Sequence, residues 1–196
     1  MIKILRSCLL GLLALPLAAQ TPGFSVDGGL ILGLDSLRKA THNSLGFTVG
    51  ADYSSPVLEN GISSRVGLAV ALMPGSEKYG LKTSLTLIQA HGDLLIETGA
   101  PALHGIAGVS VNSYSMSTSG TESQDPLDVD HHFPVRDVKG LKLGLRLGLN
   151  YTFTKSFSAE LLFQQTELAG KDLQDPLVRQ GGINPAWFEL DARFHF

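Results

Sequence analysis

The last ten residues of the chain, from Trp187 to Phe196, limit most strongly what it can fold into. Apolar and polar residues alternate without a break from Phe188 onward, and Trp187 is the one residue that departs from the pattern. A period of two predicts a β-strand with one apolar face and one ionic face. A strand in this position needs a neighbour on each side to avoid a sticky edge, and closure of a barrel supplies both. The apolar face comprises Phe188, Leu190, Ala192, Phe194 and Phe196, and the polar face Glu189, Asp191, Arg193 and His195.

The same alternation recurs along the chain and predicts eight strands in all, with no helical periodicity between them. Most are close to the roughly 9–11 residues that a tilted strand needs to cross a bilayer. In the fourth strand the apolar phase, which begins with Leu85 and Leu87, changes near His91-Gly92-Asp93, and this change predicts a β-bulge. The seven earlier strands are expected at residues 24–34, 45–53, 65–72, 84–96, 107–112, 141–153 and 157–164.

Alternation alone does not say which face is wet, because a soluble sandwich or a lipocalin-like barrel also alternates, with its apolar face inward. Two features favour the inverted, membrane-spanning arrangement. The polar face is rich in Gly, Ser and Ala with charges between them, which suits the narrow interior of an eight-stranded barrel. The aromatic residues also gather at one end, as in the girdle at a membrane interface. They are Phe24, Tyr53, Tyr151, Phe153, Phe157, Phe194 and Phe196.

The connections between the expected strands differ in length at the two ends. Those at the aromatic end are short, and the two longest connections both fall at the other end. Short periplasmic turns and longer extracellular loops are typical of outer-membrane barrels. The short connections are near 54–61, 98–103 and 154–155, and the others are near 35–42, 74–79, 115–138 and 168–185.

With its terminal Phe196 after alternating apolar residues, the chain resembles the small bacterial outer-membrane β-barrels of the OmpA/OmpX or OmpW-like type. The resemblance implies an all-β, eight-stranded antiparallel up-and-down transmembrane barrel in the outer membrane of a Gram-negative cell envelope. It also implies contact with outer-membrane lipid, either lipopolysaccharide or phospholipid. The outer-membrane assembly machinery would engage the C-terminal strand ending at Phe196. An extracellular ligand is left open.

The N-terminus predicts a cleaved secretory signal peptide over residues 1–19, followed by one barrel domain over 20–196. Lys3 and Arg6 precede an apolar run that is too short to span a bilayer as a helix. Cleavage after Ala19 removes Cys8, the one cysteine, and changes the net charge from −3 to −5, because 13 basic residues then face 18 acidic ones. A mildly acidic protein of this kind is not expected to bind nucleic acid.

The charged residues on the polar faces are expected to pair inside the barrel and form a plug, because an unpaired charge in a narrow lumen is costly. The alternative is a polar conduit for a small solute, which eight strands leave little room for. Arg146 is expected to pair with Glu160, Asp191 or Glu189. The expected lumenal set is Asp27, Asp52, Arg65, Lys82, Lys142, Arg146, Glu160, Glu189, Asp191 and Arg193.

No catalytic, cofactor-binding or metal-binding residue is predicted. Asp128, Asp130, His131 and His132 have metal-ligand chemistry, but adjacent histidines on extended backbone point apart. A lipid-modifying enzyme would need a nucleophile beside a base. His42 and Ser44 share parity without an evident acid, and His195 shares a face with Asp191 without an evident serine.

The sequence is consistent with three functions. The leading one is a non-enzymatic, membrane-anchored barrel that presents extracellular loops for interaction or adhesion. The second is a small barrel that binds or passes a small hydrophobic solute, and the third is a lipid-modifying outer-membrane enzyme.

Overall fold

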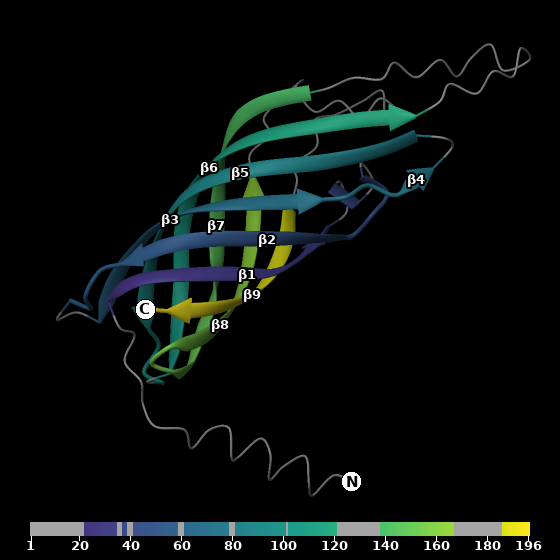
Figure 1. Ribbon diagram of the computed structural model, residues 1–196. Coiled ribbons are helices and arrows are strands. Elements are labelled where there is room, and N and C mark those ends of the chain that lie inside the picture. The colour runs from purple at the N-terminus through teal and green to yellow at the C-terminus, as the bar shows by residue number, and fades with distance from the viewer. Residues whose placement is uncertain are drawn as a thin grey trace, which may run out of the picture.

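The computed structural model describes residues 22–34, 37–38, 41–58, 61–78, 81–100, 102–120, 138–166 and 186–196. Within them eight long strands form a closed antiparallel barrel, to which the two-residue strand β4 is added, as Figure 1 shows. The predicted fold is confirmed. No helix in these residues is long and apolar enough to cross a membrane. The strands are β1 (Gly23–Gly33), β2 (Leu45–Ser54), β3 (Ile62–Met73), β4 (Glu77–Lys78), β5 (Leu81–Glu97), β6 (Leu103–Gly120), β7 (Val138–Thr154), β8 (Phe157–Thr166) and β9 (Ala186–His195).

The barrel closes where the first and last strands meet. β9 pairs with β8 on one side and with β1 on the other, where Leu30 lies opposite Leu190. The amide of Phe196 donates to the carbonyl of Phe24 at 3.0 Å. The C-terminal strand therefore has a neighbour on both sides, as the sequence predicted, and the sheet has no open edge there. The predicted signal peptide, residues 1–19, lies outside the described residues and stays a prediction.

The faces of the barrel are inverted relative to a soluble protein. On β7, Leu141, Leu143, Leu145, Leu147 and Leu149 are 46–67% exposed, whereas Arg146 between them is 2% exposed. Aromatic rings gather at the end with the short turns, where Phe24 packs on Tyr53 and Phe157 on Phe194. An exposed apolar wall around a buried ionic interior is the arrangement that a bilayer requires. The predicted membrane-spanning arrangement, with the apolar face outward, is therefore confirmed.

The predicted bulge in the fourth long strand is wrong. β5 pairs with β3 and with β6 without a register shift, through His91 and Asp93. One parity faces the lumen along the whole strand, so Leu85 and Leu87 point inward and Ile88 points outward. The phase seemed to change because the lumen is apolar at one end and ionic further down, not because the backbone shifts. A register shift lies instead between Thr152 and Thr154, beside the turn to β8.

An apolar layer roofs the lumen at the end with the long loops. Leu37, in the β1–β2 connection, enters this layer and is 1% exposed, and its amide donates to the carbonyl of Leu34 in a helical turn. Gly33 and Gly46 make room for Met73, since a Cβ on either would lie 2.7 Å from its side chain. The layer consists of Ile31, Leu37, Ala71, Met73, Leu85, Leu87, Tyr114, Met116 and Trp187.

β5, β6 and β7 are longer than the other strands and continue past the barrel on the side of the long loops (Figure 1). β7 pairs with β8 only from Gly144 downward, but with β6 as far up as Val138. Residues 115–120 are therefore strand, and the loop predicted at 115–138 is shorter than expected. The extension projects three strands beyond the membrane-spanning wall.

Candidate functional site: the lumenal ion-pair network

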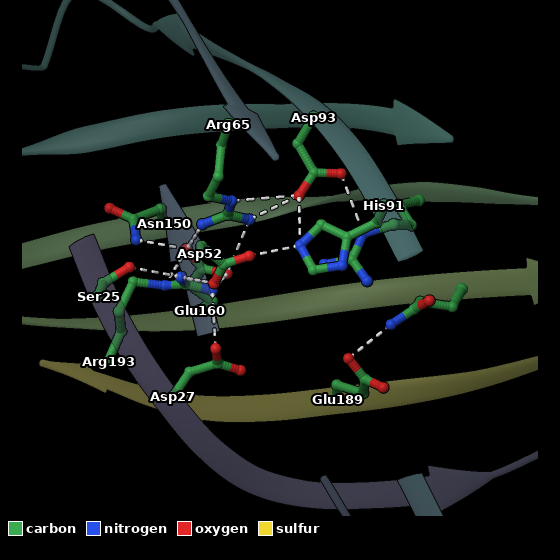
Figure 2. A network of polar contacts seen from close by, with 12 residues as sticks. Ser25, Asp27, Asp52, Arg65, His91, Asp93, Asn150, Glu160, Glu189 and Arg193 are labelled. Atoms are coloured by element: carbon green, nitrogen blue, oxygen red, sulfur yellow. Dashed lines mark hydrogen bonds and ion pairs between the residues drawn. The ribbon is translucent and has the colours of Figure 1, made fainter. Parts of the chain in front are cut away.

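Arg65 on β3 lies at the centre of a buried polar network that crosses the lumen (Figure 2). Its Nη2 donates to Asp93 Oδ2 at 2.8 Å, on the neighbouring strand β5, where the two residues are register partners. The same guanidinium pairs with Glu160 on β8, which lies across the barrel. Both donors of the fork are thus used on carboxylates, the geometry in which Arg binds most strongly.

A second arginine, Arg193 on β9, shares Glu160 with Arg65. Its Nη2 donates to Glu160 Oε2 at 3.1 Å, and its Nη1 pairs with Asp52 on β2 and donates to Ser25 Oγ at 3.0 Å. The amide of Asn150 donates to Glu160 at 2.8 Å. Glu160 therefore joins two cations from different sides of the barrel and ties β3, β7, β8 and β9 together.

Arg146 on β7 completes the chain of ion pairs, with a partner that the sequence did not predict. Its Nε donates to Asp93 Oδ1 at 3.0 Å, and it also donates to Gln89. The predicted pairing with Glu160, Asp191 or Glu189 is wrong. The reason is the misplaced phase of β5, which had kept Asp93 out of the expected lumenal set. Asp93 bridges Arg146 and Arg65 as Glu160 bridges Arg65 and Arg193.

His91 is a further lumenal residue that sequence reasoning missed. Its Nε2 lies 2.6 Å from Asp52 Oδ1 and 3.9 Å from Asp93 Oδ2, so it stands between two carboxylates (Figure 2). The available signal was the polar series Gln89, His91 and Asp93 at a spacing of two, opposite Ile88, Leu94 and Ile96. Leu85 and Leu87 face the same side as that series. Because both are apolar, the sequence pattern did not identify this side of the strand as the polar one.

A set of uncharged donors connects the network to the apolar roof. The amide of Gln89 donates to Gln164 at 2.7 Å, and Gln164 donates to Glu189 at 2.5 Å. The indole of Trp187 donates to Glu189 at 2.9 Å, and the ring itself is 2% exposed within the roof. This explains why Trp187 departed from the sequence pattern. It faces the lumen with the polar parity, at the level where the lumen becomes apolar.

The charges in the described lumen are less balanced than the sequence suggested. Six buried carboxylates, on Asp27, Asp52, Asp93, Glu160, Glu189 and Asp191, face three buried arginines and His91. Asp191 Oδ1 has no hydrogen-bond partner, and Asp191 lies opposite Glu160 in the register. Of the predicted lumenal residues, Lys142 is half-buried, but Lys82 is exposed on the outer side, because its parity in β5 is the outward one.

His195 contacts a serine that the sequence did not reveal. Ser158 Oγ lies 2.9 Å from His195 Nε2 and accepts a hydrogen bond from Asn150 at 3.1 Å. The pair has the residue types of a nucleophile and a base. However, Ser158 is 0% exposed and faces the lumen, so a substrate in the lipid cannot reach its hydroxyl.

The other candidate residues do not assemble a site in the described part of the chain. His42 has a φ of 51° and lies in a turn, in which the side chain of Asn43 donates to the carbonyl of Pro74 at 2.6 Å. The carbonyl of Ser44 accepts from the amide of Gly33 at 2.7 Å. The described residues hold no group of three metal-ligating side chains. Residues Asp128, Asp130, His131 and His132 lie outside the described residues.

What this network can do chemically is to fill and stiffen the barrel. Its guanidinium groups are shared among carboxylates on many strands, and none of these side chains is more than slightly exposed. Such a network costs desolvation energy but fixes one arrangement of the strands around it. The predicted salt-bridged plug therefore agrees with the geometry.

No family model matches the chain, and no curated protein sequence matches it. Solved structures do match. Ail, the attachment invasion locus protein of Yersinia pestis, has a TM-score of 0.56 at 11% identity and covers 90% of this chain and 100% of that one. Neisserial surface protein A has a TM-score of 0.54 at 12% identity, covering 88% and 96%. The N-terminal β-barrel domain of Pseudomonas aeruginosa OprF has a TM-score of 0.52 at 11% identity, covering 90% and 100%. The chain therefore has the fold of the small eight-stranded outer-membrane barrels, which confirms the predicted resemblance in architecture.

Proposed function

We propose that this protein is a non-enzymatic outer-membrane anchor whose sealed barrel holds extracellular loops for interaction or adhesion. The observation that carries the proposal is the double closure of the lumen. The ionic network around Arg65, Glu160 and Arg193 fills its middle, and the apolar roof with Leu37 closes the end with the long loops. A solute would have to break both layers, so the polar conduit is disfavoured.

The extension of β5, β6 and β7 supports a role in presentation. β6 ends at Gly120 and β7 begins at Val138, so both ends of the connection between them lie on the extension. The closed barrel gives this extension a rigid base. The hydrophobic wall only needs to anchor it.

The charge of the two long connections suggests the class of partner. Residues 121–137 contain five carboxylates and one arginine, and residues 167–185 contain three carboxylates and two basic side chains. Ail has been crystallised with the heparin analogue sucrose octasulfate. An acidic surface of this kind repels such a polyanion, so we infer that the partner is a basic protein surface rather than a sulfated glycan.

Two measurements test the proposal. Planar bilayers containing the purified protein should show no steady conductance, and Leu37→Asp combined with Glu160→Ala serves as the opened control. A stable, ion-conducting wild type would overturn the sealed barrel. Cells displaying the protein should bind beads coated with polylysine in preference to heparin beads. A variant with 121–137 replaced by a short Gly-Ser turn should lose that binding. Equal binding by both proteins would overturn the role of the loop.

A further inference from the structure

Three buried acceptor atoms inside the barrel have no hydrogen-bond partner among the described residues. They are Oδ1 of Asp27, Oδ1 of Asp191 and Nδ1 of His91. Nε2 of His91 lies 2.6 Å from Asp52 (Figure 2), so in the neutral ring Nε2 donates to that carboxylate and Nδ1 is an acceptor. Buried acceptors are costly unless a donor or a cation lies beside them. We call Asp27, Asp191 and His91 the acceptor cluster.

The strand register brings the two carboxylates of this cluster together. Gly29 pairs with Asp191, and Asp27 pairs with Arg193, so Asp27 and Asp191 are diagonal neighbours on the inner face of β1 and β9. Diagonal neighbours on one face lie about 7–8 Å apart, and the distance between their side chains is shorter. The carboxylate of Asp191 also leans toward β1, because its Oδ1 lies where a Cβ on Gly29 would be. One ion can therefore contact both carboxylates.

Small residues leave room around the carboxylates on this side of the lumen. Asp27 lies over Gly50 of β2, where a Cβ would be 2.8 Å from its Oδ1. Thr48, two residues earlier on β2, adds a hydroxyl group to the same inner face. Asp27 and Thr48 are 9% and 7% exposed although the roof and the network close the lumen, whereas Arg65 is 1% exposed. The carboxylate and the hydroxyl group therefore border a polar space that can hold water or an ion.

The charge around the acceptor cluster is more negative than the arginines can balance. Six buried carboxylates face three buried arginines in the described lumen, which leaves three negative charges, or two when His91 is protonated. The carboxylates of Glu189, Glu160 and Asp27 all lie close enough to repel that of Asp191. Asp27 has one guanidinium within 4 Å, at 3.7 Å from its Oδ1, and Asp191 has none in the described part of the chain.

Lys142, the half-buried lysine of the lumen, is too far away to balance this charge. Asn150, Glu160 and Asp191 are register partners across β7, β8 and β9. Lys142 lies eight residues from Asn150 along β7, toward the long loops, which is about 26 Å. The excess negative charge at the acceptor cluster therefore favours a bound cation.

From these observations we infer that the inner wall of β9, β1 and β2 binds one Ca²⁺ ion, held between Asp27 and Asp191. The ion neutralises the two carboxylates, and its bound water donates to the remaining acceptors, including Nδ1 of His91. The hydroxyl group of Thr48 is a further oxygen ligand. Because the protein supplies only these side chains, water completes the coordination, as is common for this ion. The site lies in the lumen and does not depend on the function proposed for the extracellular loops.

The ligands select the kind of ion. Carboxylate, hydroxyl and water oxygens bind hard cations such as Ca²⁺ and Mg²⁺. Mg²⁺ demands a near-ideal octahedron, whereas Ca²⁺ accepts six to eight oxygens in irregular geometry. Side chains that approach from neighbouring strands on one side of the lumen suit the irregular geometry. A divalent charge also matches the two carboxylates, Asp27 and Asp191, better than a monovalent ion does.

The first test is retention of Ca²⁺ by the mature protein. The protein is refolded in detergent with Ca²⁺ present, because the roof and the network close the folded lumen, and is then desalted. Elemental analysis should find one Ca²⁺ per chain in the wild type. Asp27→Asn and Asp191→Asn keep the shape of the side chain and remove one charged ligand, so each should weaken binding at least about tenfold. Neither carboxylate has an arginine within 3.5 Å among the described residues, so both variants should fold.

The second test is urea unfolding followed by the fluorescence of Trp187, in Ca²⁺ and in EDTA. When Ca²⁺ is present at one hundred times its dissociation constant, the unfolding equilibrium constant of the wild type should be about a hundredfold lower than in EDTA. Asp191→Asn should show no such difference. In EDTA this substitution removes only a buried like charge, so it should not destabilise the barrel.

Two controls separate the lumenal site from carboxylates elsewhere. Glu97→Gln removes an exposed carboxylate at the end with the short turns, and replacement of 121–137 by a Gly-Ser turn removes five loop carboxylates. Both variants should retain one Ca²⁺. A wild type without Ca²⁺, equal retention by Asp27→Asn and the wild type, or loss of the ion from either control would overturn the proposal. Identical wild-type unfolding in Ca²⁺ and EDTA would also overturn it, because protons would then neutralise the carboxylates.

Discussion

Asp93→Asn gives the sharpest test of the lumenal network. Asp93 accepts hydrogen bonds from Arg65 at 2.8 Å and from Arg146 at 3.0 Å, and both arginines are buried. Arg65 retains Glu160 when Asp93 is neutral, but Arg146 then keeps its hydrogen bond to the side-chain oxygen of Gln89 and has no carboxylate within ion-pair distance among the described residues. Removing one partner of a buried pair costs about 3–5 kcal/mol, because the remaining charge stays desolvated. Asp93→Asn should therefore lower the free energy of unfolding by that amount.

The coupling energy between Asp93 and Arg146, measured in a double-mutant cycle, distinguishes an ion pair from a general packing effect. Arg146→Met leaves Asp93 paired with Arg65 and fills most of the volume, so it should cost only about 1–2 kcal/mol. In the Arg146→Met variant, Asp93→Asn leaves no buried cation without a carboxylate partner. It should therefore lower the free energy of unfolding by only about 1–2 kcal/mol as well. The expected coupling energy is about 2–3 kcal/mol, within the range found for residues in one network.

The assay is urea unfolding of the protein in detergent micelles or thin vesicles. Trp187 is the one tryptophan of the chain and lies inside the barrel, so its fluorescence reports the lumen directly. Asp191→Asn is the matched control, because Asp191 Oδ1 has no hydrogen-bond partner and the residue lies opposite Glu160. It should be neutral or stabilising, since it removes a buried like charge. Additive losses for Asp93 and Arg146, within about 0.5 kcal/mol, would refute the pairing.

Two other substitutions test the wall and the roof. Leu147→Arg, near the middle of the apolar wall, should cost about 2–4 kcal/mol in vesicles, whereas Leu141→Arg, near the outer interface, should cost at most about 1 kcal/mol; equal costs for the two would contradict the membrane placement. Gly46→Val should destabilise the barrel by about 1–3 kcal/mol, because its Cβ would lie 2.7 Å from Met73 Cγ. Adding Met73→Ala should recover part of that loss, and no recovery would show that the conflict lies with the backbone of Leu72 instead.

Much of the fold could be predicted from the sequence alone. The alternation in β7, β8 and β9 is regular because the outward residues all face lipid and the inward residues are mostly small or polar. The location of the aromatic rings at one end, and the unequal lengths of the connections, also follow from the order of residues. These features depend on one strand at a time, and a period of two is a local property of the backbone.

The pairing inside the barrel was decided by the tertiary structure. Asp93 and His91 belong to the lumen because β5 keeps one phase past Leu85 and Leu87, which face an apolar roof that no single strand reveals. Arg65 reaches Glu160 across the lumen, between strands far apart in the sequence. Register and curvature set these distances, whereas alternation gives only the face on which a residue lies. The sequence by itself determined which residues face inward along most strands, and only closure of the barrel decided which of them meet.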